Sequence, residues 1–344
     1  MKKIVLLIIL LLTTSCQDYV EINDFAIISG IILDYKDNQI DMTSELIINE
    51  EETKIKVFNT QGKTIDECLS KISTLSNKDI FISHLKALIL TDNIIEKNIN
   101  IYDYFLRSSK SKMNFKIYTI KPELKDKIFK TDTTESISQY IDKMITYNDK
   151  IYSSSNTLTF IDLMYKKLEP NLEPIYPTLD IQEDQIKLSN LSFYAKDKIT
   201  LTNKQAIYYN LLTNNIEKTI LNLKCNENNY SLLTKEIKTK KNYNKNTKEF
   251  TYDINISASI NNYECTQNID KKEEIDKLNK LSSAQIKENI KELINIQNQN
   301  NYDFLGIKNY VQKHSKQNEI NNIKINVNTQ INSIGEMRRW TKIK

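Results

Sequence analysis

The chain has 344 residues, of which 40% are hydrophobic, and its 48 basic and 44 acidic side chains leave a formal net charge of +4. This composition is far from that of a disordered chain, and the near balance of charge is not the basic footprint of a nucleic-acid-binding protein. A chain of this length is expected to fold into two or three globular domains.

The first residues, MKKIVLLIILLLTTSC, have the pattern of a bacterial lipoprotein signal peptide: two lysines, an apolar run, and small residues before Cys16. We predict a cleaved leader over residues 1–15 and a lipid on Cys16. Thr13 stands where a lipobox normally has leucine, and an uncleaved anchor is the alternative. No later apolar run is long enough to span a bilayer, so the rest is expected to be a soluble body outside the cytoplasm.

Two strand patterns joined by a turn follow the leader. The first reaches Asp34, and the alternation of apolar and polar residues over residues 40–48 predicts a strand that returns antiparallel to it. A short strand is expected around residues 55–57. Thr64 and Glu67 then have the spacing of a capping box, which predicts the start of a helix.

The best-specified stretch is residues 80–121, which we interpret as strand, helix and strand. A near-continuous apolar run ends at Thr91, whose side chain can accept an amide hydrogen bond at a helix start. Apolar side chains then recur at the spacing of one helix face, at Ile95, Ile99, Tyr102 and Leu106. Alternation from Met113 to Ile117 indicates a strand with one buried face. Two strands joined in this way are expected to be parallel.

Two helices and a domain boundary are expected next. Asp132 and Glu135 repeat the capping spacing before an apolar-faced helix, and a second helix carries Phe160 and Leu168. Prolines cannot lie in a helix interior, and three of the four lie close together, at Pro170, Pro174 and Pro177. We therefore place the boundary shortly after them.

The second half is expected to combine a sheet with a long helix. Thr202 and Gln205 have the capping-box spacing. Apolar side chains alternate without interruption over residues 250–260, which predicts a half-buried strand. An amphipathic helix is expected over residues 271–296, and a last strand over residues 323–331.

These patterns predict an α+β fold with more than one domain. The first domain, residues 16–185, is expected to contain mixed sheets with antiparallel hairpins and the strand–helix–strand unit, in one or two subdomains. The second domain, residues 186–344, is expected to be an antiparallel sheet with a long helix.

Few residues suggest chemistry. Cys225 and Cys265 flank a run of adjacent strands and are candidates for a disulfide, with buried thiols as the alternative. His84 and His314 are the two histidines, and neither belongs to a zinc or catalytic motif. We interpret His84 as a packing residue within an apolar strand and His314 as solvated. The sequence predicts no enzyme, no metal site and no cofactor.

Four segments of the chain carry a family resemblance: QDYVEINDFAIISGIILDY, SHLKALILTD with NINIYDYFLRSSKSKMNFKIY, SNLSFYAKDKITLTNKQAIYYNLLTNNIEK, and NYDFLGIKNYVQKH. They resemble the spore germination receptor C-subunit lipoproteins, the Ger(x)C family. The resemblance covers nearly the whole chain after the leader. It departs in one place, because the family's longer, Trp-containing insert before the last strand is replaced here by the short segment 316–321.

The resemblance implies a non-enzymatic subunit of a spore nutrient-germinant receptor. Such a subunit works with membrane-embedded A-type and B-type subunits, and its lipid holds it on the outer face of the spore inner membrane. The alternative is an envelope lipoprotein that binds a solute for a transporter. Bilobal solute binders are built from repeated parallel βαβ units, whereas this chain mixes hairpins with occasional helices. We therefore favour the receptor subunit, which needs no nucleic acid, and leave small-molecule binding open.

A protein that acts by contact is expected to carry its functional residues in exposed loops. Two polar loops are candidates for contact with a partner. One is the turn that contributes Asp197, Lys198 and Asn203, and the other is the serine-rich loop that contributes Ser154 and Asn156.

Overall fold

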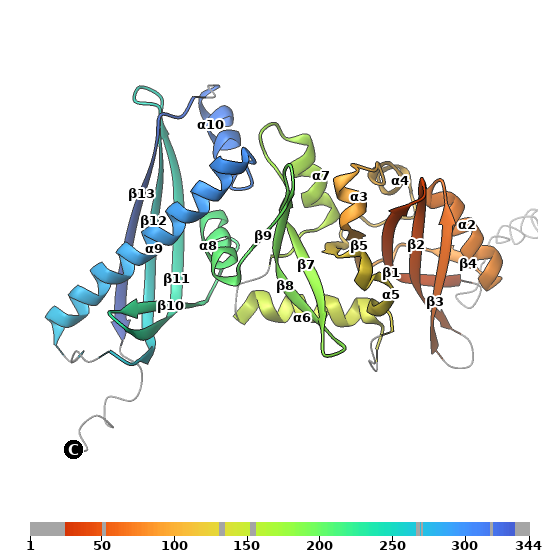
Figure 1. The fold of residues 1–344 in the computed structure, drawn as a ribbon, viewed down its shortest axis with the longest axis horizontal. Helices are drawn as coiled ribbons and strands as arrows, with labels where there is room; N and C mark the ends of the chain where they lie inside the picture. The colour runs from red at the N-terminus through yellow and green to blue at the C-terminus, as the bar shows by residue number, and fades with distance from the viewer. Residues whose placement is uncertain are drawn as a thin grey trace, which may run out of the picture.

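The computed structural model describes residues 25–49, 53–130, 135–151, 156–265, 269, 271–316 and 319–333. These residues form two β-sheets that lie along an elongated body, with helices packed on their faces (Figure 1). Within this part of the chain, every helix is too short or too polar to cross a membrane. The predicted α+β class is confirmed.

The first sheet has nine strands among the described residues, in the order β3-β2-β1-β5-β6-β7-β8-β9, with β4 paired to β1. Its strands are β1 (Phe25–Lys36), β2 (Gln39–Asn49), β3 (Thr53–Gly62), β4 (Asp79–Phe81), β5 (Ala87–Thr91), β6 (Lys116–Ile120), β7 (Tyr176–Gln182), β8 (Gln185–Tyr194) and β9 (Lys198–Leu201). Antiparallel hairpins stand at both ends, and β1, β5, β6 and β7 are parallel.

The predicted hairpin is confirmed as β1 and β2. Asp37 and Asn38 form its two-residue turn with φ of 50° and 59°. Asp and Asn tolerate this left-handed region better than most residues, and positive φ at both positions gives the twist that antiparallel neighbours need. The strand predicted around residues 55–57 is the centre of β3.

The strand–helix–strand unit is confirmed, with β5 and β6 parallel, but its details differ. The second strand was predicted to begin at Met113, and it begins at Lys116. The helix is broken into α3 (Asp92–Glu96) and α4 (Tyr102–Arg107), with Asn98 at φ 49° between them. The apolar run before it is divided into β4 and β5. His84 lies in the exposed turn between these strands and contacts the Phe81 ring, so its assignment to a strand was wrong.

Helices cover both faces of the first sheet. One face packs against α2 (Ile65–Ser76), α3, α4 and α7 (Phe160–Leu168), and the other packs against α5 (Lys125–Ile128) and α6 (Ile137–Ile151). A strand covered on both faces is apolar throughout. This explains why β5 is buried at all five positions, and why β6 is buried at four, where one buried face was predicted.

The predicted helix starts are mostly confirmed. Thr64 Oγ1 accepts the Glu67 N–H at 3.1 Å, and Thr202 begins α8 with a complete capping box. Thr159, which was not predicted as a cap, begins α7 with another. Asp132 lies outside the described residues. The first turn of α6 is capped instead by Ser136, whose Oγ accepts the Gln139 N–H at 3.3 Å.

The second sheet has the order β10-β11-β12-β13. It comprises β10 (Ile220–Cys225), β11 (Asn228–Asn244), β12 (Glu249–Tyr263) and β13 (Asn322–Ser333), with α8 (Asn203–Thr213), α9 (Lys272–Asn300) and α10 (Ile307–Ser315). The expected antiparallel pairing holds for β10, β11 and β12, whereas β13 pairs parallel to β12. The difference arises because α9 and α10 carry the chain back to the end of the sheet where β12 begins.

The predicted boundary between residues 185 and 186 lies inside the β7–β8 hairpin, between the first two residues of β8. The first sheet continues through β8 to β9, and the inner side chains of these strands join the core of the second half. Phe193 of β8 stacks on Tyr302 and Phe304, with ring centroids 5.0 Å and 4.8 Å apart. Strand β8 therefore belongs to both cores.

Candidate functional site

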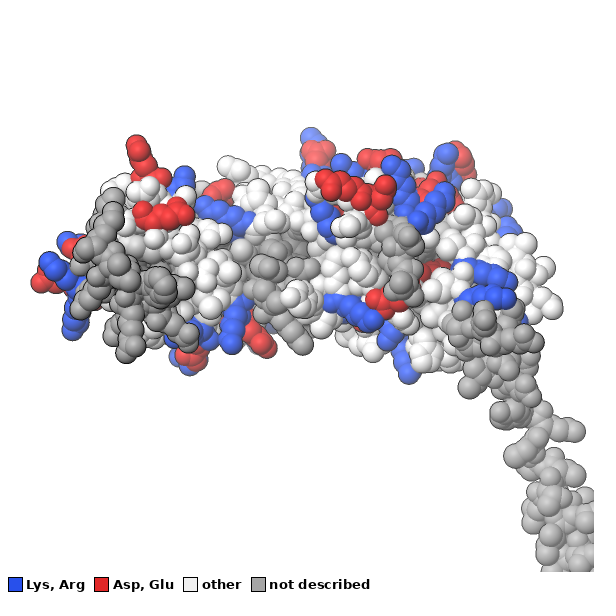
Figure 2. Space-filling view, turned by 90° about the horizontal axis from the view of Figure 1, so that it is seen from below, with Lys and Arg blue, Asp and Glu red and all other residues white. Residues whose placement is uncertain are grey.

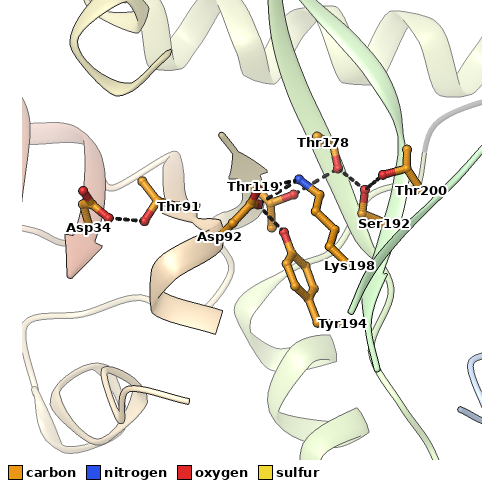
Figure 3. Close-up of polar contacts among 9 residues, drawn as sticks. All are labelled: Asp34, Thr91, Asp92, Thr119, Thr178, Ser192, Tyr194, Lys198 and Thr200. Carbon is orange, nitrogen blue, oxygen red and sulfur yellow. Dashed lines mark hydrogen bonds and ion pairs between the residues drawn. The ribbon is translucent and has the colours of Figure 1, made fainter. Parts of the chain in front are cut away.

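Polar side chains gather where the parallel strands β1, β5 and β6 end, and they continue across β7 to β9 (Figure 3). The carboxyl ends of parallel strands meet at one edge of a sheet, which is where α/β proteins commonly place ligands. We call this set the polar seam, and it consists of Asp34, Thr91, Asp92, Thr119, Thr178, Ser192, Tyr194, Lys198 and Thr200.

Asp34 is the seam residue that lies on β1. Its Oδ1 accepts hydrogen bonds from Thr91 Oγ1 at 2.5 Å, Asn93 Nδ2 at 2.9 Å and the Tyr35 N–H at 2.8 Å. The residue is only 7% exposed. Its carboxylate is therefore used to join β1 to the start of α3, and Thr91, which was expected to cap that helix, donates to Asp34 instead.

Asp92 links the start of α3 to β9. Both of its carboxylate oxygens accept from Lys198 Nζ, at 2.8 Å and 2.9 Å, and Oδ1 also accepts from the Tyr194 hydroxyl at 2.6 Å. The side chains of Asp92 and Lys198 are 14% and 17% exposed. Burial, and then the Asp92 charge, raise the pKa of Tyr194 above its ordinary value. Tyr194 therefore stays protonated and donates to Asp92.

A row of hydroxyl groups completes the seam. Thr119 and Thr178 lie 3.0 Å apart, Thr178 donates to Ser192 at 2.9 Å, and Ser192 and Thr200 lie 3.0 Å apart. A hydroxyl nucleophile needs a neighbouring base. Both histidines lie elsewhere, His84 in the β4–β5 turn and His314 on α10. The hydroxyl row itself joins four strands, β6, β7, β8 and β9.

A pocket of about 480 Å³ adjoins the seam at Tyr194. It is lined by Ile95, Asn98, Lys167, Glu169, Leu172, Glu173, Pro174, Tyr176, Tyr194 and Tyr302. Burial lowers the pKa of Lys167, whose Nζ lies 4.9 Å from the Tyr102 ring centroid. The pocket holds a cation, two carboxylates and three phenols, which are groups that bind a small polar solute.

A buried carboxylate that the sequence did not reveal lies on the face of the first sheet that packs against α6. Glu45 is 1% exposed. Its Oε1 accepts the Ile137 N–H at 2.6 Å, and its Oε2 accepts from the hydroxyls of Ser29, Ser136 and Ser138 at 2.7, 2.9 and 2.7 Å. The N-terminus of a helix favours a negative charge. Glu45 therefore holds α6 against the β1–β2 hairpin.

The candidate contact residues differ in their exposure. Asp197 and Asn203 are exposed, in the β8–β9 turn and the first turn of α8. Lys198 is largely buried in its pair with Asp92. Asn156 is only 7% exposed, so its assignment to an exposed loop was wrong: the chain here turns inward to bring Leu158 into the core and Thr159 to a bridge with Lys116. Ser154 lies outside the described residues, as does Cys16.

Cys225 and Cys265 are joined by a disulfide, and their Cα atoms are 6.1 Å apart. That separation lies within the range that a disulfide requires. The bond connects the ends of β10 and β12 across β11. The remaining described cysteine, Cys68, is a buried free thiol. Across the described ranges, no three His, Cys, Asp or Glu side chains are grouped to hold a metal ion.

Comparisons with known proteins cover both halves of the chain. Residues 18–181 match the family model "Spore germination protein N-terminal domain", and residues 192–335 match "Spore germination B3/ GerAC like, C-terminal". Spore germination protein GerQC of Bacillus cereus is 22% identical over 273 residues, which span 76% of each chain. Spore germination protein A3 of Bacillus subtilis (strain 168) is 21% identical over 269 residues, covering 73% of this chain and 71% of that protein.

The fold also has a solved counterpart. The crystal structure of the GerBC protein matches with a TM-score of 0.52 at 10% identity, covering 88% of this chain and 96% of that one. This likeness supports the fold alone, and the two family models support the family. The resemblance seen in the sequence is therefore confirmed, and the chain belongs to the GerAC-like family of germinant receptor C subunits.

Proposed function

We propose that this protein is a non-enzymatic, lipid-anchored subunit of a spore nutrient-germinant receptor. It contributes to germination signalling by contact with membrane-embedded A-type and B-type subunits. The observation that carries this proposal is the family match over both halves, residues 18–181 and 192–335. Together these matches account for nearly all of the chain after the predicted leader.

The anchor follows from Cys16, which lies two residues before the first family match. Acylation there tethers the folded body to the outer face of the spore inner membrane. A tether raises the effective concentration of the body near a membrane-embedded partner, so a weak interface is sufficient for binding. Affinity for the same partner in free solution is then modest.

Action by contact is supported by how the seam is built. Each charged group of the seam has partners within the protein: Lys198 pairs with Asp92, and the Asp34 carboxylate accepts from three neutral donors. Its hydroxyls join strands and have no histidine beside them. On the face shown in Figure 2, basic and acidic side chains of the described residues are interspersed, which suits a protein interface better than a nucleic-acid-binding surface.

A second candidate function is that of a solute-binding envelope lipoprotein that serves a transporter. The pocket beside Tyr194 favours it, because Lys167 and Glu173 offer opposite charges to a zwitterionic solute. The arrangement of strands does not, because antiparallel hairpins flank the parallel strands where a bilobal binder would repeat βαβ units.

One experiment separates the two functions. The acylated protein is cross-linked in spore membranes and recovered with its partners, and the purified full chain is titrated by calorimetry with amino acids, sugars and nucleosides. We expect A-type and B-type subunits in the cross-linked complex. Tight one-to-one binding of a solute, with transporter subunits recovered instead, would establish the second function.

The exposed candidate residues allow a matched test of the interface. Asp197→Lys and Asn203→Lys should reduce recovery of the membrane subunits. Glu227→Lys, in the exposed β10–β11 turn, changes the charge by as much as Asp197→Lys and serves as the control. If the Asp197→Lys and Asn203→Lys variants recover as much of the membrane subunits as the wild-type protein does, the β8–β9 turn and the start of α8 are excluded from the interface.

A further inference from the structure

A groove of about 660 Å³ lies between the C-terminal half of α9, the start of α10 and the N-terminal half of β13. We call it the α9–β13 groove, and it is lined by Lys287, Lys291, Ile294, Asn295, Gln297, Asn298, Ile307, Lys308, Ile320, Asn321, Asn322, Ile323, Lys324 and Ile325. It is formed by elements of the second half of the chain, whereas the polar seam lies on the first sheet and α3 (Figure 1).

Strand β13 is the edge of the second sheet among the described residues. Helix α9 runs along this edge and supplies side chains that accept its outward N–H groups. Asn279 Oδ1 accepts from the Ile331 N–H at 2.9 Å, and Ser283 Oγ accepts from the Thr329 N–H at 3.0 Å. Alternate residues of a strand direct their N–H groups to the same side, so Ile325 directs its N–H toward the groove as well.

The pattern on α9 changes where the groove begins. Asn279 and Ser283 are followed, at the same four-residue spacing, by Lys287 and Lys291. An ammonium group donates hydrogen bonds and cannot accept one. Acceptors on α9 thus cover the C-terminal part of the β13 edge, and donors replace them beside Ile325 in its N-terminal part. The groove therefore presents backbone N–H groups together with positive charges.

The charge of the groove has one sign. Four lysines line it, and no Asp or Glu does. Lys291 also meets Glu288 at 3.1 Å, and Lys308 donates to the Asn301 side chain at 2.9 Å. Lys287 and Lys324 have no carboxylate partner within the described part of the chain. A ligand that supplies both carboxylates and backbone carbonyl groups would complement these donors.

The floor of the groove is apolar. Ile294, Ile307 and Ile325 are 5%, 1% and 4% exposed, and Ile320 and Ile323 are partly exposed. An extended peptide that pairs with a sheet edge sends alternate side chains to opposite sides, so it can place apolar side chains on such a floor and acidic ones at the lysines.

We propose that the α9–β13 groove binds an extended acidic segment of a partner protein, which adds to β13 as a further strand. The peptide carbonyl groups accept from the outward N–H groups of β13 beside the groove, such as that of Ile325, and its carboxylates pair with Lys287, Lys291 and Lys324. The proposal rests on the groove alone and goes beyond the assignment to a germinant receptor.

The test uses the full-length chain in detergent and labelled eight-residue peptides that alternate Glu or Asp with Val, Ile or Tyr. Fluorescence anisotropy measures their binding. Three matched probes accompany them: the same peptides with Gln or Asn in place of the acids, the same peptides with alternate backbone nitrogens methylated, and vesicles that contain anionic lipid.

We expect the acidic peptides to bind, and both altered forms to bind at least about tenfold more weakly, because one lacks charge and the other cannot pair as a strand. Lys287→Glu combined with Lys324→Glu should weaken binding about tenfold or more, because two attractive charge pairs become repulsive. Lys280→Glu, on α9 outside the groove, should leave binding unchanged.

Three results would overturn the proposal. The first is that no peptide binds, which is expected if the lysines only protect the sheet edge from unwanted pairing. Equal binding of the methylated and unmethylated peptides would exclude strand addition. Binding of anionic vesicles without binding of peptides, lost in the Lys287→Glu and Lys324→Glu double variant, would identify the groove as a lipid headgroup site instead.

Discussion

A side chain on Gly30 and the hydroxyl of Ser138 would occupy the same space: a Cβ built on Gly30 would lie 1.8 Å from Ser138 Oγ. Gly30 lies in β1 beside an irregularity in its pairing with β2. Ser138 belongs to the first turn of α6, the turn that Glu45 holds. Glycine is thus required here because the helix approaches the strand backbone more closely than any side chain would allow.

Replacing Gly30 with alanine should destabilise the fold by about 1–3 kcal/mol, the usual cost of overpacking a core. Urea unfolding of the full chain in detergent measures the change. In a Ser138→Gly background the same replacement should cost less, because the clashing atoms are gone. An equal cost in both backgrounds would show that α6 does not approach β1 at this residue.

The pair formed by Asp92 and Lys198 should couple α3 to β9. Lys198→Met leaves the buried Asp92 carboxylate with only the Tyr194 hydroxyl as a partner. The substitution should therefore destabilise the wild-type protein more than it destabilises the Asp92→Asn variant. Neighbouring charges of this kind give coupling energies of about 1–3 kcal/mol. A double-mutant cycle from urea unfolding measures the coupling, and a value near zero would contradict the contact.

Loss of the bond between Cys225 and Cys265 should lower stability by about 2–4 kcal/mol, since it closes a long loop in the unfolded chain. Reducing agent should lower the melting temperature of the wild-type protein. Without reducing agent, the Cys225→Ser and Cys265→Ser double variant should melt at a lower temperature than the wild-type protein. Adding reducing agent should not change the melting temperature of this variant. A reducing agent that left the wild-type melting temperature unchanged would show that the thiols are free.

Cys16→Ala should abolish acylation. Its product should be an unprocessed precursor or a protein released from membranes, because stable attachment needs more than one acyl chain. Detergent phase partitioning and the mass of the N-terminal peptide report both outcomes. Normal processing with full membrane retention would mean that something other than a lipid on Cys16 holds the chain at the membrane.

Local signals in the sequence predicted much of the fold. The turn at Asp37 and Asn38, the caps at Thr64 and Thr202, and the alternation along β12 each depend on neighbours within a few residues. Such signals lie within short stretches of the chain, and the structure confirms the turn, the caps and the strand that they predict.

Features that depend on distant segments were not predictable. Alternation along β2 puts Glu45 on the face opposite Met42 and Leu46, and nothing nearby shows that α6 covers that face. The parallel pairing of β13 depends on the path of α9 and α10. The polar seam joins Asp92 to Lys198, 106 residues later in the chain. Of the five candidate contact residues, only Asp197 and Asn203 are seen to be exposed.

The most direct test of the account is to delete the gene in its host and score the germination of the spores against a panel of nutrients. The account predicts that the response to at least one nutrient is lost, that the wild-type gene restores it, and that the Cys16→Ala gene does not. Normal germination with every nutrient, accompanied by reduced uptake of one solute, would contradict the receptor role and support a solute-binding lipoprotein.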